Sequence, residues 1–430
     1  MGGPTATSAG PDAQTRGLAA TAGGFGLENL PFGVARLPDG SVRVVSILAD
    51  RVIDLSGLAR AGRLGDVALP DGVFEERSLN AFLACGRAAL AGVRRALVDL
   101  ARVGGAGVPR DCTAPVAAVE LLVPVAVGDF VDFSASLHHA TRVGRLLRPG
   151  ADPLPAQWRR QPVGYHGRAG SVVASGTAVE RPWGQFAGPG GAPVVAPTAA
   201  LDLEAEVGFV VGEGSEQGVP VPAGAFGDHV AGVVLVNDWS ARDVQAFESR
   251  PLGPFLAKSF ATSVSPWLVT LEALAPHRVA GPRQDPAPAP YLVAPGPAAY
   301  DLHVEVTLQS AAMREQGLAP VRVCAAAVAD LYWTGPQLLA HLTLNGAPVR
   351  PGDLFASGTV SGPSSDAMAC LLELTGAGAR PLALPDGSAR AYLEDGDTVV
   401  VRGWAGAGAR PAICLGEVTG TVVAARTMEV

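Results

Sequence analysis

Three acidic residues alternate with apolar ones between Leu201 and Val207, in the order Asp202, Glu204 and Glu206. On an extended strand this alternation puts the three carboxylates on one face, with neighbours about 6.6–6.8 Å apart. Carboxylates with no cation among them repel one another, and an oxygen-rich set of this kind suits a hard divalent ion such as Mg²⁺ or Ca²⁺. The same pattern is typical of the solvent side of a half-buried strand, so the spacing alone leaves both interpretations open.

Two further acids and a histidine favour the metal interpretation. Asp132 lies in the apolar run 130–133, and Asp238 follows the apolar run 232–237. His139 stands seven residues after Asp132. A lone histidine is more often structural, and an Asp that ends a strand often only caps a turn. Near an acid and a divalent ion, however, an imidazole is suited to take a proton from water at neutral pH.

The only lysine of the chain stands in apolar surroundings. Lysine and arginine together number 32, and Lys258 is the single lysine among them. A compact ammonium with three donors cannot be replaced by a guanidinium fork. Because residues 253–260 are mostly apolar and a buried lysine needs a partner or a task, the sequence predicts a functional lysine.

Composition excludes several classes of function. The net charge of −8 and the pI near 5.4 leave no basic surface for nucleic acid, and no apolar run is long enough to span a membrane. Five scattered cysteines without a CxxC pair favour a reducing compartment. We therefore predict a cytoplasmic protein. No GxGxxG, P-loop, GxSxG or HExxH motif occurs, so nucleotide and serine-triad chemistries lack support.

The surrounding pattern predicts a mainly β (α+β) protein in three parts: a disordered tail over 1–23, a small domain over 24–118 and a larger domain over 119–430. In the small domain we expect a hairpin of the strands 42–48 and 51–55, and one helix over 79–103. In the larger domain we expect strands at 201–211, 230–236, 302–308, 371–374 and 398–401, helices at 242–248 (after a capping box at 240–243) and 336–343, and surface loops at 187–197 and 281–297.

Several longer motifs are more specific than any single residue. They are Asn29–Val34, Gly128–Phe133 with His139–Thr141, Pro162–Ala169, Asn237–Asp243, Pro251–Phe260 and Arg350–Thr359. In this order, and over about residues 26 to 425, the chain resembles the fumarylacetoacetase family. The resemblance implies a small SH3-like barrel followed by a mixed β-sandwich roll, and a homodimer. It also implies hydrolysis of a carbon–carbon bond between two carbonyls, giving fumarate and acetoacetate at the end of tyrosine and homogentisate breakdown.

The resemblance also implies a role for individual residues. The ligands of a Mg²⁺ or Ca²⁺ ion would be Asp132, Glu204, Glu206 and Asp238, with Lys258 and Thr262 beside it. His139 would be the general base, oriented by Glu373, while Arg242, Gln245 and Lys258 would stabilise the oxyanion. The substrate would contact Ser134, Arg148, Tyr165, Gln245, Ser249 and Thr359.

Two of these positions depart from the family pattern, because the family usually carries tyrosine where this chain has Ser134 and Ser249. We therefore also consider a fumarylacetoacetase-like enzyme that acts on a different diketo acid in a specialised pathway. A second alternative is a decarboxylase or isomerase of the same superfamily, which needs no water-activating pair. A third is a non-catalytic metabolite-binding protein, which the retained acids and lysine disfavour.

Overall fold

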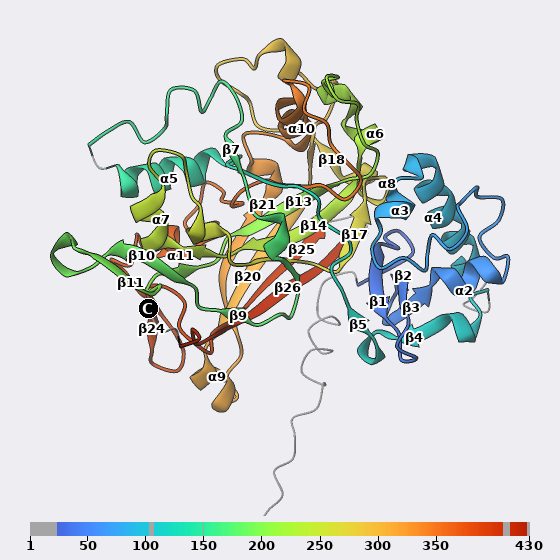
Figure 1. Cartoon of the computed structure of the whole chain (residues 1–430), viewed down its shortest axis with the longest axis horizontal. Coiled ribbons are helices and arrows are strands. Elements are labelled where there is room, and N and C mark those ends of the chain that lie inside the picture. Colours follow the sequence, from blue (N-terminus) through green and yellow to red (C-terminus); the bar gives the residue numbers. More distant parts are fainter. Residues whose placement is uncertain (1–23, 103–106, 149, 407–412, 428–430) are drawn as a thin grey trace, which may run out of the picture.

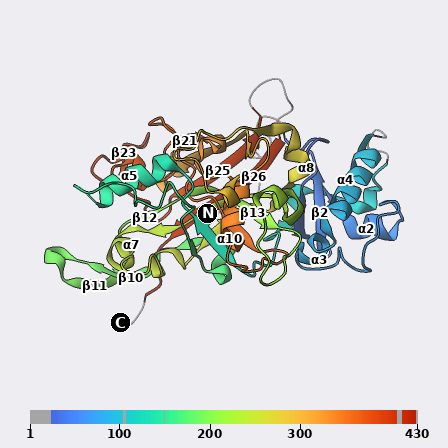
Figure 2. The ribbon, with the colours of Figure 1, turned by 90° about the horizontal axis from the view of Figure 1, so that it is seen from above.

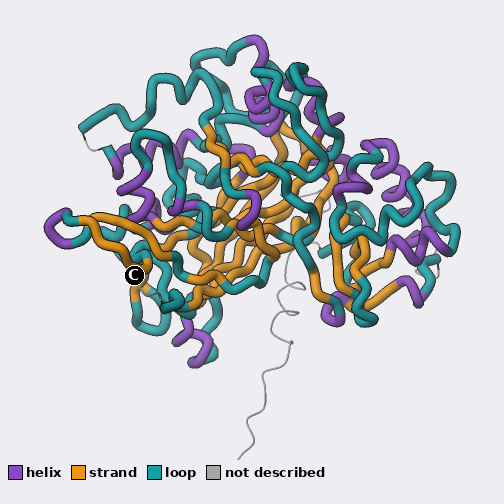
Figure 3. The backbone as a smooth tube through the Cα atoms, in the orientation of Figure 1, coloured by secondary structure: helices purple, strands orange, loops and turns teal. Residues whose placement is uncertain are grey.

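The structure is a computed structural model that describes residues 24–102, 107–148, 150–406 and 413–427. The predicted tail over 1–23 lies outside these residues. Strands form the centre of the molecule and short helices surround them (Figure 3), which confirms the expected sheet-dominated α+β class. Within the described residues, no helix is both long and apolar enough to cross a membrane.

The N-terminal part builds four strands and three helices at one end of the molecule (Figure 1; from above, Figure 2). Its antiparallel strands are β1 (Phe32–Arg36), β2 (Val42–Leu48), β3 (Arg51–Asp54) and β4 (Thr113–Pro115), and its helices are α2 (Leu55–Arg60), α3 (Asn80–Leu83) and α4 (Gly86–Arg102). The predicted hairpin is confirmed. It ends at Asp54 because that carboxylate accepts the Ser56 amide and begins α2. The expected single helix is interrupted before Gly86, whose φ of 79° is left-handed.

This part is continuous with the rest of the molecule. β1 pairs with β17 (Trp267–Thr270), and the sheet continues through β14 (Val230–Asp238), β13 (Ala205–Val211), β22 (Leu354–Ala356), β6 (Phe130–Phe133) and β7 (Gly164–His166). One hydrophobic cluster joins helix residues such as Leu90 to Val234 and Val236 of the central strand. The short strand β5 (Glu120–Leu121) pairs with β1. The domain boundary at 118/119 stays a prediction.

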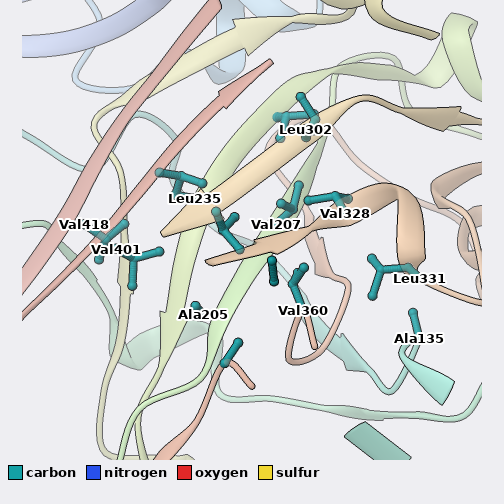
Figure 4. Packing of buried hydrophobic residues seen from close by; sticks show 14 of the residues in the cluster. Ala135, Ala205, Val207, Leu235, Leu302, Val328, Leu331, Val360, Val401 and Val418 are labelled. Atoms are coloured by element: carbon teal, nitrogen blue, oxygen red, sulfur yellow. The ribbon is translucent and has the colours of Figure 1, made fainter. Parts of the chain in front are cut away.

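A second sheet packs against the first and encloses the main core. Its order is β21 (Val321–Ala327), β20 (Leu302–Gln309), β25 (Thr398–Ala405), β26 (Ile413–Val423) and β9 (Val179–Glu180). Figure 4 shows Val207 and Leu235 of the first sheet beside Leu302 and Val401 of the second. All four side chains are fully or almost fully buried. This packing makes the two central strands of the first sheet rigid supports for the residues at their ends.

Two more strands belong to the first sheet: β16 (Thr262–Val264) pairs with β14, and β8 (Val172–Ala174) pairs with β16. The other elements lie outside these two sheets. The strands among them are β10 (Trp183–Ala187), β11 (Pro193–Pro197), β12 (Leu201–Asp202), β15 (Ser240–Ala241), β18 (Arg278–Val279), β19 (Ala299–Tyr300), β23 (Leu382–Ala383) and β24 (Ala389–Arg390). The helices are α5 (Leu137–Leu147), α6 (Phe226–His229), α7 (Arg242–Glu248), α8 (Leu271–Leu274), α9 (Ala311–Glu315), α10 (Gly335–Thr343) and α11 (Leu371–Leu374).

Several local predictions were wrong, each for an identifiable reason. Residues 371–374 form helix α11 instead of a strand, because the Asp202 carboxylate accepts the Leu371 and Leu372 amides. The same acid interrupts the expected strand at 201–211, which divides into β12 and β13. Residues 187–197, expected to be a loop, lie largely in the hairpin β10–β11. Helix α7 forms as predicted, but without a side-chain cap, because Ser240 is paired in β15.

Candidate active site

Four buried carboxylates meet where three central strands end. Asp132 comes from β6, Glu206 from β13 and Asp238 from the last position of β14. Glu204 lies in the break between β12 and β13, where its amide donates to the Asn237 side chain over 3.0 Å. One oxygen from each of the four lies within 4.8 Å of the others. Of the two interpretations that the spacing left open, the solvent side of a strand is therefore wrong for Glu204 and Glu206, which lie in a buried cluster.

The sole lysine closes one side of this cluster. Lys258 is 4% exposed, and its Nζ donates to Glu204 and, over 2.8 Å, to Asp238. Asp238 also accepts the Thr262 hydroxyl at 2.7 Å and the Tyr165 hydroxyl at 3.0 Å. The lysine is therefore buried with carboxylate partners, and its predicted function stays a prediction. Of the four acids, Glu204 and Asp238 are thus supplied with donors.

The other two acids lack such donors. Among the described residues, no donor reaches either oxygen of Glu206 or Oδ1 of Asp132. The two carboxyl groups can hydrogen-bond to each other only through a proton that one of them carries. Burial, followed by the charges of Asp238 and Glu204, raises the pKa of Asp132 to about 8. Burial and the charge of Asp132 raise the pKa of Glu206 well above its usual value. Buried carboxylates in this condition need either protons or a cation.

The donor set fits a hard divalent metal ion. It offers four carboxylates and no thiolate. The positive charges beside these carboxylates are Lys258 and the guanidinium of Arg242, which also pairs with Asp202. The resulting excess of negative charge and the unpaired oxygens of Glu206 are what an ion such as Mg²⁺ or Ca²⁺ would satisfy. Asp132, Glu204, Glu206 and Asp238 would hold it. The identity of the ion does not follow from this set.

Arg242 connects the acidic cluster to Gln245. Its guanidinium, 7% exposed for the whole residue, donates to Asp202 over 2.8 Å, lies 2.8 Å from Oε1 of Glu204, and donates to Oε1 of Gln245 over 3.0 Å. Because the Gln245 oxygen is occupied, its amide nitrogen is left as the donor for a ligand. Asp202, which we expected on the face of Glu204 and Glu206, instead anchors Arg242 and α11.

A second pair, His139 with Glu373, lies beside the cluster. His139 is in the first turn of α5, where the Ser136 hydroxyl accepts its amide at 3.0 Å. Its Nδ1 lies 2.7 Å from Oε2 of Glu373, which comes from α11. A neutral imidazole that donates Nδ1–H to the carboxylate presents Nε2 as a base. The predicted pairing of the two residues is observed in the structure; their roles in catalysis stay a prediction.

Glu373 is fully buried and has several donors. Besides His139 they are Ser361 at 2.7 Å, Cys370 at 3.3 Å and Arg142 at 3.3 Å. Burial alone would raise the pKa of Glu373, but the charge of His139 and the hydrogen bonds lower it to about 2. Conversely, burial would lower the pKa of His139, but Glu373 outweighs that effect and raises it.

A cavity of about 320 Å³ opens onto both groups, which is large enough for a small metabolite. Of the predicted residues, its lining includes Asp132, Ser134, His139, Tyr165, Glu204, Gln245, Lys258 and Thr359. Arg148 and Ser249 are not part of this lining: the Arg148 guanidinium binds the Pro153 carbonyl, and the Ser249 hydroxyl binds the Gln245 carbonyl.

Sequence reasoning missed the residues that support this site. Ser361, Cys370 and Arg142 converge on Glu373 from three different segments, and Asp202 joins Arg242 to α11. Two positions offered a signal in the sequence: Arg142 lies one helical turn after His139, and Cys370 lies three residues before Glu373. Ser361 and Asp202 are brought to their partners by tertiary packing.

Comparison with known proteins agrees with this geometry. Residues 28–126 match the family model for the fumarylacetoacetase N-terminal region, and residues 130–423 match that for the fumarylacetoacetate hydrolase C-terminal region. The fumarylacetoacetase of Arabidopsis thaliana is 42% identical over 83% of this chain and 85% of its own. That of Homo sapiens is 39% identical over 84% and 87%. A solved fumarylacetoacetate hydrolase from Exiguobacterium antarcticum shares the fold, with a TM-score of 0.52 at 17% identity over 92% of this chain and 99% of its own.

Proposed function

Because this chain belongs to the fumarylacetoacetase family, we propose that it is a hydrolase of carbon–carbon bonds in 1,3-diketo acids. Its default reaction converts fumarylacetoacetate and water into fumarate and acetoacetate. The observation that carries this proposal is the juxtaposition of a metal-competent acidic cluster with the 2.7 Å His139–Glu373 pair on one cavity. Hydrolysis needs both parts, one for the diketone and one for water.

The reaction begins with the activation of water. Nε2 of His139 takes a proton from water in the cavity while Glu373 holds the ring and stabilises the imidazolium that forms. The hydroxide adds to one carbonyl carbon, and the bond from that carbon to the methylene between the carbonyls breaks. The departing carbon is released as an enolate. The proton that Nε2 of His139 took from water is passed to that carbon, which completes acetoacetate and restores the neutral imidazole.

Negative charge develops on two oxygens, and cationic or donor groups lie beside both. Lys258 and the amide of Gln245 line the cavity and are positioned to donate to the attacked carbonyl oxygen. Arg242 lies behind Gln245 and acts by orienting it. A divalent ion in the acidic cluster would supply Lewis-acid stabilisation of the enolate. Tyr165 and Thr359 border the same cavity. The Thr359 hydroxyl has no partner among the described residues and is available to a substrate carboxylate, whereas the Tyr165 hydroxyl donates to Asp238.

One observation supports a related diketo acid as an alternative substrate. Ser134 lines the cavity with a small side chain, and a diketo acid with a larger substituent would fit against it. The alternative of a decarboxylase or isomerase is less well supported, because neither reaction requires a group that activates water. We further propose that the enzyme is a cytoplasmic homodimer acting in tyrosine catabolism. The five free cysteines are consistent with a reducing compartment.

The direct test is a spectrophotometric assay of the purified protein with fumarylacetoacetate and Mg²⁺. We expect loss of the diketone absorbance, little turnover in His139→Asn, and equimolar fumarate and acetoacetate. Products of decarboxylation or isomerisation would contradict the proposal. If fumarylacetoacetate is stable but a larger 1,3-diketo acid is cleaved, the reaction class holds and the substrate changes. Light scattering on a sizing column tests the homodimer.

A further inference from the structure

A single carboxylate closes the loop that leads from α7 to the sole lysine. Glu248, the last residue of α7, accepts three successive backbone amides, those of Phe255 at 2.7 Å, Leu256 at 3.1 Å and Ala257 at 2.9 Å. The next residue along the chain is Lys258. Hydrogen bonds to an ionised acceptor are about twice as strong as neutral ones, so this arrangement fixes the turn that carries the lysine.

The loop held in this way also forms part of the cavity. Leu252, Gly253 and Pro254 line it, and the Gly253 amide donates to the Ser249 carbonyl over 2.9 Å. Gly253 has a φ of 101°, which an L-residue rarely adopts. One short segment therefore supplies a wall of the cavity and leads directly to Lys258, the cation that pairs with the acidic cluster.

Apolar burial gives the tip of the loop little support. Leu252 is 97% exposed, Phe255 63% and Leu256 48%. The same helix that ends at Glu248 begins at Arg242 and carries Gln245. The Glu248 carboxylate thus joins the element that orients Gln245 to the turn that presents Lys258.

We propose that Glu248 is a positioning residue, which holds the 249–257 loop closed so that Lys258 stays in the acidic cluster and the loop walls the cavity. Its effect on hydrolysis rests on the proposed function, but the closure itself does not. Loss of the carboxylate leaves three amides without their acceptor, and the loop then opens more often because these hydrogen bonds no longer hold it to α7.

The uniqueness of Lys258 provides a test that needs no substrate. An amine-specific reagent labels only Lys258 and the α-amino group, which mass spectrometry separates. In Glu248→Ala we expect labelling of Lys258 to be about tenfold faster or more, with faster hydrogen–deuterium exchange confined to the amides of 255–257. Glu248→Gln, which keeps one acceptor oxygen, should lie between. The matched control is Glu216→Ala, since Glu216 is exposed in another loop and should behave as wild type.

Hydrolysis then links closure to function. In Glu248→Ala we expect a lower kcat, because Lys258 is displaced, and a higher KM, because the cavity wall is loosened; Glu248→Gln should recover part of both. A merely structural role would lower the melting temperature without changing the labelling of Lys258. Labelling and exchange equal to wild type in both folded variants would overturn the proposal. Faster labelling in a protein whose wild type does not cleave the diketone would support the closure and reject the proposed hydrolysis.

Discussion

Glu206 and Glu373 are both fully buried glutamates of one site, yet their surroundings are opposite. Glu373 is held by His139, Ser361, Cys370 and Arg142, and its pKa falls to about 2. Glu206 has no donor among the described residues except a proton shared with Asp132, and its pKa rises well above the usual value. One carboxylate already has its cationic partner within the protein, whereas the other is arranged for a cation from solution.

This difference separates two tasks that would interfere in a single group. A carboxylate that orients a base must stay ionised and fixed, and internal donors achieve this. A metal ligand must present free lone pairs, which makes the empty cluster costly. The site therefore combines a part that is complete by folding alone with a part that is completed by binding.

Removal of the metal ion should have the largest effect on activity, because Glu206 depends on a cation from solution and Glu373 does not. A chelator should lower hydrolysis of fumarylacetoacetate by at least about 10³-fold, because the enolate then loses its Lewis acid, and added Mg²⁺ should restore it. Glu206→Gln should resemble the chelated enzyme even with Mg²⁺ present. Glu305→Gln, at a partly exposed position of β20, is the control. Undiminished activity after exhaustive chelation would refute a metal-dependent reaction.

Removing the internal partner should be the next largest effect. Glu373→Gln should lower kcat about 10²–10⁴-fold, because the imidazole loses its orientation and its counter-charge. Since Glu373 raises the pKa of His139, wild-type activity should fall as the pH drops through that raised value. In the variant this acid limb should move to lower pH. A pH–rate profile of kcat/KM measures both, and an unmoved limb would argue that His139 is not the titrating base.

The two carboxylate types should also differ in their effect on stability. Asp132 has a folded-state pKa of about 8 against about 3.9 when unfolded, so the chelated protein binds more protons when folded and loses stability as the pH rises from about 5 to 8. The slope is about 1.4 kcal/mol per pH unit for each such proton. Denaturant unfolding at several pH values checks this. Saturating Mg²⁺ or the substitution Asp132→Asn should flatten the slope. An equal slope in the chelated wild type, the Mg²⁺-saturated wild type and Asp132→Asn would contradict the assignment of the raised pKa to Asp132.

The smallest effect should come from the cavity wall. Ser134→Tyr adds bulk at the lining and should change KM for fumarylacetoacetate about 2- to 10-fold, the value of one hydrogen bond. Diketo acids with larger substituents should lose much more. Comparison of kcat/KM across a substrate series sharpens the assignment of the substrate. Equal losses for all substrates would show that Ser134 does not set specificity.

The sequence predicted which residues lie together at the site better than it predicted the bounds of some local elements. Asp132, Glu204, Glu206, Asp238 and Lys258 were selected from residue type and motif, and the structure brings all five together. A continuous apolar run located β14, which is buried along almost its whole length, and strand periodicity located β20, because burial on a half-buried strand has a period of two. It failed at Asp202, which looked like one more acid of a continuous strand.

What could not be predicted depends on distant contacts. Asp202 ends β12 because it binds Arg242 and caps α11, 169 residues away, and no local pattern encodes this pairing. Two donors of Glu373, Ser361 and Arg142, likewise come from separate segments. Arg148 and Ser249 were placed at the substrate by motif, yet the Arg148 side chain binds the Pro153 carbonyl of the following loop and the Ser249 side chain binds the Gln245 carbonyl of α7.

Proton release on metal binding tests the central claim most directly. At pH 7 the raised pKa values of Asp132 and Glu206 mean that the ion displaces protons, while Glu373 and Glu204, with lowered pKa values, contribute none. Calorimetric titration with Mg²⁺ in buffers of different ionisation enthalpy counts these protons. We predict net release in the wild type, less in Asp132→Asn and Glu206→Gln, and no change from the wild type in Glu305→Gln. Binding without proton release, or release unchanged in both ligand variants, would contradict the account.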